Sequence, residues 1–463
     1  MPPRLCQKAL SALLPALPRP ACRAPRALSR PFSATPAASA QQYERIQVPC
    51  RSNGSVTVDV FHATTPSSPV LLYLPPGPVL PQSADEEHNL ITTLAKASAA
   101  TVVRINYRAS PAHQYPTPCH DVLLCYDWVR EHLLVDDFNR PYLARLGVCG
   151  ELIGGSLATM LALTECHVGQ TRIGAAAVNN PLVDWVFPDD LPIVKPEELP
   201  EPLYGDETEF PADEDIAGSS ALQEATRKAL ESERKGRKKK SASKAQPLTS
   251  WQAHGDNAVI PSLTLSGERD VLFSRPEDYF DRFASPIHFF RSPHAQLISP
   301  QPDDTFASQQ PNELLDIETQ ISLSHYATFE RGVKTPPPPL PLPYLSRCRA
   351  YARNYPPAGT HLTLPVWNIS TGLQSPLSDS ALELAKMLRR SIARQTMRAH
   401  TGRSRWHDLA EKKHYEEFAH GRIQVNSHRG VGLWSRQESN PQWKAQVENV
   451  GAWMRQRLDP AFT

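Results

Sequence analysis

Apolar strand-like runs alternate with helical patterns between residues 48 and about 190, and this order constrains the fold more than any other feature of the sequence. The strand-like runs are short and rich in β-branched or small apolar residues: VLLYL at 70–74, TVVRI at 101–105, RLGV at 145–148 and AAAVN at 175–179. Residues 84–99, 121–134 and 154–167 lie between them and carry apolar side chains at helical spacing. This order predicts parallel strands that helices cover on both faces.

The later part of the chain continues the same pattern after two insertions. Strands are predicted at 364–370 and 422–425, a long helix at 379–395, and a last helix from about residue 441. Residues 44–190, 251–298 and 344–463 are predicted to form one α/β domain. Residues 191–250 are predicted to be a basic insertion or lid, and residues 299–343 a proline-rich insertion. We therefore expect an α/β fold with a doubly wound, mostly parallel sheet of about eight strands and two insertions.

The first 43 residues have the composition of a mitochondrial presequence. They contain no Asp or Glu, and their charged side chains are those of Arg4, Lys8, Arg19, Arg23, Arg26 and Arg30. The stretch SRPFSATPAA at 29–38 also resembles a matrix-protease cleavage region. We therefore expect a disordered leader and import into the mitochondrial matrix. The alternative is a disordered N-terminal tail without a function.

Charge and composition exclude several classes of protein. The formal net charge is +1, so the chain as a whole shows no preference for nucleic acid. No apolar run approaches the ~18 residues of a membrane-spanning helix. Six of the eight cysteines lie outside the leader without a C-x-x-C pattern, which predicts free core thiols in a reducing compartment. The histidines show no metal-binding spacing, so we expect no metal or cofactor.

A run of basic residues, KGRKKK from Lys235 to Lys240, lies inside the first insertion. It could contact RNA or anionic lipid, but a solvated insertion tip is the simpler interpretation because no aromatic side chains are interleaved with the charges. The rest of the sequence gives no specific signal for nucleic acid.

The segment CGELIGGSLATMLALTE, at residues 149–165, predicts a tight turn from a strand into a helix. Gly150 and Gly154 permit the turn, and Leu152 lies at its centre. In a nucleophile elbow of the form G-x-S-x-G, such a turn lifts the central side chain above the edge of the sheet. Here the central side chain has no atom that can attack a carbonyl.

Five fragments, in order, resemble the hormone-sensitive-lipase-like branch (fold 3) of the α/β-hydrolase superfamily. LLYLPPGPV at 71–79 is similar to the strand before H-G-G-G, and YRASPAHQYP at 107–116 to Y-R-x-x-P-E-x-x-x-P, with Ala112 in place of the glutamate. GELIGGSLA at 150–158 is similar to G-D-S-A-G-G-x-L-A, and YFDRFASP at 279–286 to N-P-x-x-S-P. LPVWNISTGLQSPL at 364–377 is similar to the strand and G-x-D-P-L that carry the catalytic acid. The resemblance implies an α/β-hydrolase fold and, in active relatives, ester hydrolysis by a serine nucleophile.

The same resemblance assigns the catalytic positions one by one, and each is degenerate. The nucleophile position holds Leu152, the acid position Ser375, and the base position Val431, with His428 about three residues too early. A serine, an imidazole and a carboxylate act only as a hydrogen-bonded unit. In the loop PPGP, three of four residues lack an N–H, which leaves Gly77 and Ile153 as the donors of an oxyanion-like pocket.

A second register remains open for the acid and the base. SLTLSGERDVLF at 262–273 could be a strand followed by G-x-x-D, with Asp270 as the acid. PIHFFRSPHAQ at 286–296 would then supply the following strand and His294 as the base. This register restores an acid and a base but no nucleophile.

Three functions follow from these features. The first is a degenerate hydrolase, or pseudoenzyme, that binds a small apolar ligand or a protein partner in the old pocket, in mitochondria. The second is an active esterase or lipase-type hydrolase with a non-standard site. The third is an accessory subunit or assembly factor of a mitochondrial complex that uses the basic insertion.

Overall fold

The computed structural model describes residues 43–50, 54–65, 68–80, 83–135, 140, 145–169, 171–192, 194, 198–202, 249–299, 343–403 and 406–458. The expected presequence, apart from Tyr43, lies outside these residues. So do the Lys235–Lys240 run and nearly all of the proline-rich insertion.

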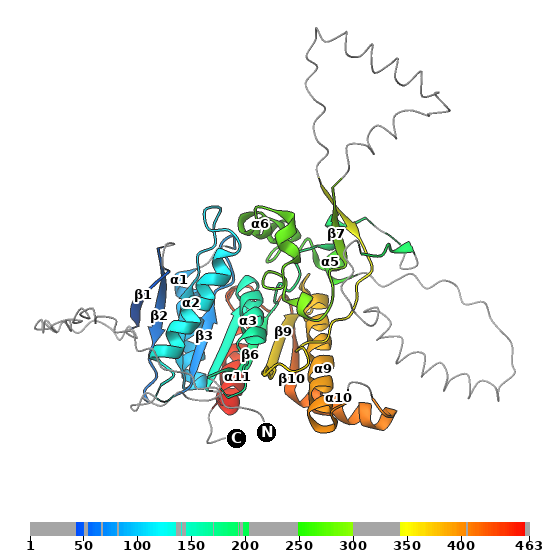
Figure 1. The fold of residues 1–463 in the computed structure, drawn as a ribbon. Coiled ribbons are helices and arrows are strands. Elements are labelled where there is room, and N and C mark those ends of the chain that lie inside the picture. The colour runs from blue at the N-terminus through cyan, green and yellow to red at the C-terminus, as the bar shows by residue number, and fades with distance from the viewer. Residues whose placement is uncertain are drawn as a thin grey trace, which may run out of the picture. The chain divides into compact units, whose positions relative to one another are not determined.

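One eight-stranded sheet organises the described part of the chain (Figure 1). Its strand order is β1-β2-β4-β3-β5-β6-β9-β10. The strands are β1 (Glu44–Pro49), β2 (Ser55–Phe61), β3 (Val70–Leu74), β4 (Thr101–Asn106), β5 (Leu146–Glu151), β6 (Ile173–Asn179), β9 (Val366–Gly372) and β10 (Ile423–His428). β2 pairs antiparallel with β1 and β4, and the remaining neighbours are parallel. The expected mostly parallel sheet of about eight strands is confirmed.

Helices cover the two faces of this sheet, as expected for a doubly wound α/β fold (Figure 1). The main helices are α1 (Ala84–Ser98), α2 (Thr117–His132), α3 (Ile153–Thr164), α5 (Ser250–His254), α6 (Ser262–Leu272), α9 (Ser378–Thr401), α10 (Leu409–Arg422) and α11 (Trp443–Leu458). α1 and α11 pack on one face, and α2, α3 and α9 pack on the other.

Strand β3 shows why the central strands are apolar throughout. Val70, Leu72 and Leu74 pack on the side of α2 and α3, whereas Leu71 and Tyr73 pack on the side of α1 and α11. Successive side chains of a strand point to opposite faces, so a strand with helices on both sides has no solvent-facing position. The continuous run VLLYL satisfies this condition.

The second register for the acid and the base is wrong about local structure. Residues 262–272 form helix α6, in which Leu265, Glu268 and Leu272 are buried at helical spacing after Pro261 at the N-cap. The segment Pro286–Phe289 is a short 3₁₀ helix. The strand that follows, β7 (Ala295–Ile298), pairs with β8 (Tyr344–Arg347) in a separate two-stranded sheet. Apolar residues in 262–272 looked like a strand, but their spacing buries one face of a helix.

The six cysteines of the described residues are unpaired and buried, which confirms the expected core thiols. Among the described helices, none combines the length and the apolar character needed to cross a membrane.

Candidate functional site

The turn between β5 and α3 has the strained backbone of a nucleophile elbow. Leu152 links the two elements with φ 51° and ψ −114°, a backbone conformation that residues other than glycine rarely adopt. A Cβ atom at Gly150 would lie 2.2 Å from the Gly154 carbonyl oxygen, and one at Gly154 would lie 2.2 Å from the Leu74 carbonyl oxygen. Both positions therefore require glycine.

The Leu152 side chain lies in the hydrophobic core, with 1% of its surface exposed. Its N–H donates to the Asn179 carbonyl (3.1 Å), and its carbonyl accepts from the N–H groups of Ser156 (2.9 Å) and Leu182 (3.3 Å). The apex of the turn is therefore closed in this structure, and its side chain serves packing.

The structure brings Gly77 and Ile153 together, but not as a pair of free donors. The Ile153 N–H donates to the Pro76 carbonyl oxygen at 3.1 Å. A Cβ atom at Gly77, whose φ is +136°, would lie 2.6 Å from Ile153 Cδ1 and 3.1 Å from Glu268 Oε1. The place of an oxyanion hole is thus filled by an isoleucine side chain, and the Ile153 N–H is already engaged.

A buried carboxyl group lies beside this place. Glu268 Oε1 accepts from the N–H groups of Val79 (2.8 Å) and Leu80 (3.0 Å). Burial raises the pKa of Glu268 to about 7, although these two hydrogen bonds lower it. An oxyanion hole stabilises developing negative charge with N–H donors. Here a carboxyl group lies at this place instead, and it binds the Val79 and Leu80 N–H groups.

Ser375, at the expected acid position, follows β9 and is fully buried. Its N–H donates to the Gly372 carbonyl (3.1 Å), and its hydroxyl oxygen accepts from the Leu377 N–H (3.2 Å) just before α9. The hydroxyl therefore stabilises the turn into α9. It carries no negative charge with which to orient an imidazole.

Val431, at the expected base position, lies in the loop after β10 and is 8% exposed. A Cβ atom at Gly372 would lie 2.1 Å from the Val431 carbonyl oxygen, so the acid and base loops touch through their backbones. The Leu373 N–H also donates to the His428 carbonyl at 2.8 Å. Burial lowers the pKa of His428, which favours a neutral ring there. The two loops therefore meet through their backbones, with a serine and a valine at the expected acid and base positions.

A buried polar network holds these loops against the elbow. Glu151 is fully buried and accepts hydrogen bonds from Asn179 Nδ2 (2.7 Å), the Trp434 N–H (2.6 Å) and the Ser435 N–H (3.0 Å). Asn180 Nδ2 donates to the Val431 carbonyl at 3.1 Å, and Asn179 Nδ2 donates to the Gly432 carbonyl at 2.8 Å. These bonds tie the end of β10 to the ends of β5 and β6.

The alternative acid and base do not meet. The Asp270 side chain is 74% exposed on α6, and its Oδ1 lies 4.0 Å from Arg269 Nε. His294 instead pairs with Asp184: its Nδ1 lies 3.3 Å from Asp184 Oδ2. Sequence reasoning missed Asp184, although it follows the carboxyl end of β6, where functional residues of parallel sheets gather.

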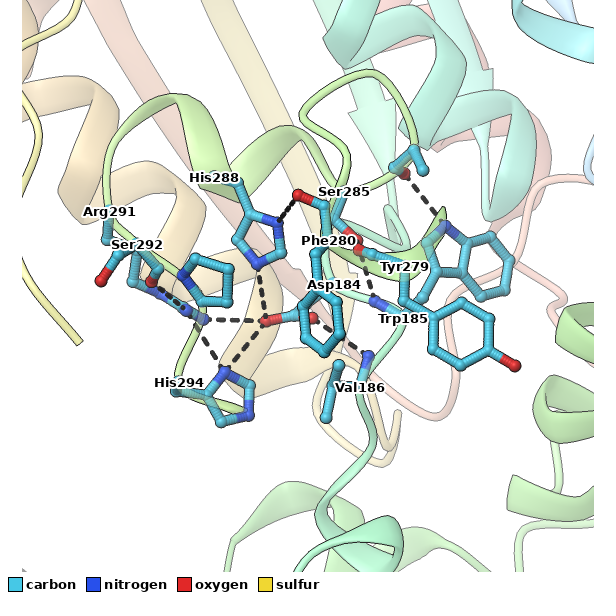
Figure 2. Close-up of polar contacts among 12 residues, drawn as sticks. Asp184, Trp185, Val186, Tyr279, Phe280, Ser285, His288, Arg291, Ser292 and His294 are labelled. Atoms are coloured by element: carbon cyan, nitrogen blue, oxygen red, sulfur yellow. Dashed lines mark hydrogen bonds and ion pairs between the residues drawn. The ribbon is translucent and has the colours of Figure 1, made fainter. Parts of the chain in front are cut away.

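Three basic side chains converge on the Asp184 carboxylate, as Figure 2 shows. Asp184 Oδ2 lies 2.9 Å from Arg291 Nη2 and 3.9 Å from His288 Nε2, in addition to the contact with His294. Arg291 Nε also donates to Glu383 Oε1 of α9 at 2.8 Å. Burial raises the pKa of Asp184, but His294, Arg291 and His288 outweigh it and hold the pKa well below its ordinary value.

His288 is the fully buried member of this cluster. Its Nδ1 lies 3.2 Å from the Phe280 carbonyl oxygen, which can only accept, so Nδ1 carries the proton (Figure 2). Its Nε2 makes no hydrogen bond within the described residues. Burial lowers the pKa of His288 to about 4, against the attraction of Asp184. The ring is therefore neutral at pH 7.

A cavity of about 430 Å³ opens beside this cluster. Asp184, Arg291 and His294 form one wall, and Glu383 and Lys386 of α9 contribute to another. The apolar lining comes from Val183, Val186, Phe187, Trp251, Leu377 and Met387. Leu152 does not line this cavity.

Comparison with known proteins identifies residues 71–287 as a match to a family described as alpha/beta hydrolase fold. Ethyl acetate hydrolase of Pseudomonas putida is 35% identical over 92 residues, which are 20% of this chain and 28% of that enzyme. Tuliposide A-converting enzyme b1 of Tulipa gesneriana is 31% identical over 119 residues, and esterase LipI of Mycobacterium tuberculosis is 30% identical over 102. These cover 24% and 22% of this chain, and 31% of each relative. The chain thus spans less than a third of these relatives.

Solved esterase structures align with most of the chain. The hyperthermophilic esterase of Pyrobaculum calidifontis has a TM-score of 0.49 at 14% identity, over 89% of this chain and 85% of that one. Carboxyl esterase 2 of Tuber melanosporum has a TM-score of 0.49 at 12% identity, over 91% and 89%.

The buried neutral His288 predicts a specific loss of stability in mild acid. The unfolded chain takes up a proton at this residue below its ordinary pKa of 6.5, whereas the folded ring stays neutral down to about pH 4. The free energy of unfolding should therefore fall by about 3 kcal/mol from this group between pH 6.5 and 4. Urea unfolding of the wild type and His288→Gln across this range should show that loss in the wild type alone; parallel curves would contradict it.

Proposed function

We propose that this chain, whose residues 71–287 match the α/β-hydrolase fold family, is a binding protein that has the hydrolase fold without acyl-transfer chemistry. One observation carries the proposal: an aliphatic, 1% exposed leucine occupies the apex of the elbow. Acyl transfer through a covalent intermediate begins with attack by a hydroxyl, thiol, amine or carboxylate. Leu152 offers none of these groups.

The surroundings of the elbow support the same conclusion independently. A hydrolase of this type lowers its barrier with N–H donors directed at the developing oxyanion, and loss of one donor typically costs ~10² to 10³ in rate. Here the Ile153 N–H is bonded to the Pro76 carbonyl, and the Glu268 carboxyl lies alongside. The site would stabilise an oxyanion poorly even if a nucleophile were present.

We place ligand binding in the 430 Å³ cavity beside Asp184 instead of at the closed elbow. The wall formed by Phe187, Trp251 and Met387 suits a small apolar molecule. His294 is one third exposed there, and its Nε2 makes no hydrogen bond within the described residues. This nitrogen could fix the orientation of one polar group on the ligand.

A second candidate function rests on the same cluster. Asp184 and His294 form a carboxylate–imidazole pair at a cavity, which is the arrangement of a general base and the group that orients it. Such a pair could activate water in a hydrolase with a non-standard site. Arg291 competes with His294 for the same Asp184 oxygen atom, which favours the structural role.

We predict that restoring the serine does not restore hydrolysis. Wild type and Leu152→Ser should both show no turnover of short acyl nitrophenyl esters above a boiled control, and no labelling by a fluorophosphonate probe. The reason is that Ser375 and Val431 supply neither carboxylate nor imidazole, and the Ile153 N–H is already bonded. Turnover is measured by nitrophenolate absorbance, and labelling by mass spectrometry.

The His294→Ala variant separates the two candidates in the same assay. Turnover by the wild type that His294→Ala abolishes would establish the second candidate and overturn the first. A covalent adduct on any side chain of the wild type would also overturn the first.

We predict that the cavity takes up one molecule of 1-anilinonaphthalene-8-sulfonate, a largely aromatic probe with one sulfonate group. Ser380→Trp places a large side chain at the lining of the cavity and should weaken binding about tenfold or more. Leu382→Trp, at a 47% exposed position of the same helix outside the lining, is the matched control and should bind as the wild type does. Equal affinities of all three proteins, measured by fluorescence titration, would place the probe elsewhere.

We also propose that the protein acts in mitochondria, on the composition of residues 1–43. Isolated energised mitochondria should import the full chain, protect it from protease and shorten it. Replacement of the six basic residues of this segment by glutamine should abolish import, since the membrane potential acts on their charge. Import unchanged by these replacements would contradict the proposal.

A further inference from the structure

The second half of α9 and the segment that follows it carry an unusual concentration of positive charge. Residues 384–407 contain seven Lys or Arg residues and no Asp or Glu, in a chain whose formal net charge is +1. Lys386 also lines the cavity beside Asp184, and the proposed function does not depend on the other six charges.

The charges form a row along one side of α9. Lys386, Arg390, Arg394 and Arg398 recur every four residues, and each step advances about 6 Å along a helix. Lys386 is exposed and the three arginines are half-buried. A regular row of cations suits an anion that repeats along a chain.

A hollow of about 310 Å³ lies beside this row, between α9 and α10; we refer to it as the α9–α10 groove. Its basic lining residues are Lys386, Arg389, Arg390, Arg394, Lys412 and His420. Glu416 is the acidic residue of this lining, and its carboxylate lies 3.8 Å from Lys412 Nζ. Arg390 and Arg394 also line a second, shallow hollow next to Arg353, so the basic surface continues along α9.

Arg389 shows that the groove holds charge without a matching carboxylate. Its Nη2 donates to the Ile423 carbonyl at 3.4 Å, and its buried Nε makes no hydrogen bond within the described residues. Burial lowers the pKa of this guanidinium, and no acidic neighbour offsets that effect. A partly desolvated cation of this kind gains from an external anion.

Trp406 lies in the lining of the same groove. Its indole is half-buried, 6.0 Å from the Tyr415 ring, with an angle of 34° between the two planes. Bases of single strands stack on aromatic side chains between basic residues, whereas bases inside a duplex are not available for stacking. An aromatic side chain thus lies among the basic residues of the groove. The Lys235–Lys240 run has no such side chain.

From this combination we propose that the α9–α10 groove binds a single-stranded polynucleotide. The row from Lys386 to Arg398 contacts successive phosphates, and a base stacks on Trp406. A membrane surface would require apolar side chains that project beside the charges. The exposed Leu409 and Phe418 of α10 do not line the groove.

Fluorescence anisotropy of the full chain with a labelled 20-nucleotide RNA, and with DNA of the same sequence, tests this proposal. Wild type should bind at least one strand, and its affinity should fall steeply with salt. Arg390→Glu combined with Arg394→Glu should weaken binding about tenfold or more and reduce the log–log salt slope by about 1.4. Trp406→Ala should weaken binding by about 5-fold to 100-fold, and Trp406→Phe less.

A matched control carries the same change of charge on the other face of the sheet. Lys444→Glu combined with Arg457→Glu, both exposed on α11, should bind as the wild type does. Arg390→Lys combined with Arg394→Lys should retain most of the binding. Thermal melting establishes that each variant is folded.

Three results would overturn the proposal: no binding of either strand by the wild type, equal losses in the groove and α11 variants, or binding of cardiolipin vesicles but not of polynucleotide. Crosslinking to 4-thiouridine RNA followed by peptide mapping adds a positional test. The crosslinks should fall within residues 386–420, and crosslinks elsewhere would contradict the assignment. None of these outcomes depends on whether the cavity beside Asp184 binds a ligand or catalyses a reaction.

Discussion

The backbone turn at Leu152 is the constraint on which the candidate site depends. Its φ of 51° costs about 1–3 kcal/mol relative to an unstrained residue. Complete burial of a leucine side chain contributes about 1.5–3 kcal/mol. The two quantities are comparable, so the burial of an aliphatic side chain that is 1% exposed can offset the strain of the turn. A leucine at the apex is therefore compatible with a stable fold.

The turn also has a structural role that does not require catalysis. Glu151, one residue before the apex, accepts three hydrogen bonds, two of them from the backbone that leads into α11. At the end of the neighbouring strand β6, Asn179 donates to the Gly432 carbonyl and Asn180 donates to the Val431 carbonyl. A buried acceptor left without its donors costs about 1–3 kcal/mol or more. Loss of the elbow geometry would thus disturb the packing of α11, which gives the fold a structural reason to keep this geometry.

The sequence predicted those parts of the fold whose pattern is local. β3, β5, β6, β9, α1, α3 and α9 follow from apolar runs and helical spacing, and Gly150 and Gly154 located the elbow. Residues 262–272 resemble a strand because Leu263 and Leu265 alternate, whereas Pro261 at the N-cap and the buried Leu265, Glu268 and Leu272 at helical spacing belong to a helix. The Asp184 cluster could not be foreseen. Its partner Arg291 lies 107 residues further along the chain, and no local pattern encodes such a contact.

Electrostatics distinguish the elbow from the surface of α9. At the elbow, the Ile153 N–H donates to the Pro76 carbonyl and the Glu268 carboxyl lies beside Gly77, so this place offers little stabilisation to a developing negative charge. On α9, Arg389 and Lys386 find no carboxylate within the described residues. Charges of one sign lining a concave surface reinforce one another and concentrate counter-ions there. The formal net charge of +1 does not reveal this difference, because it is a sum over the whole chain. The basic residues that would attract an anion are concentrated on α9 and α10.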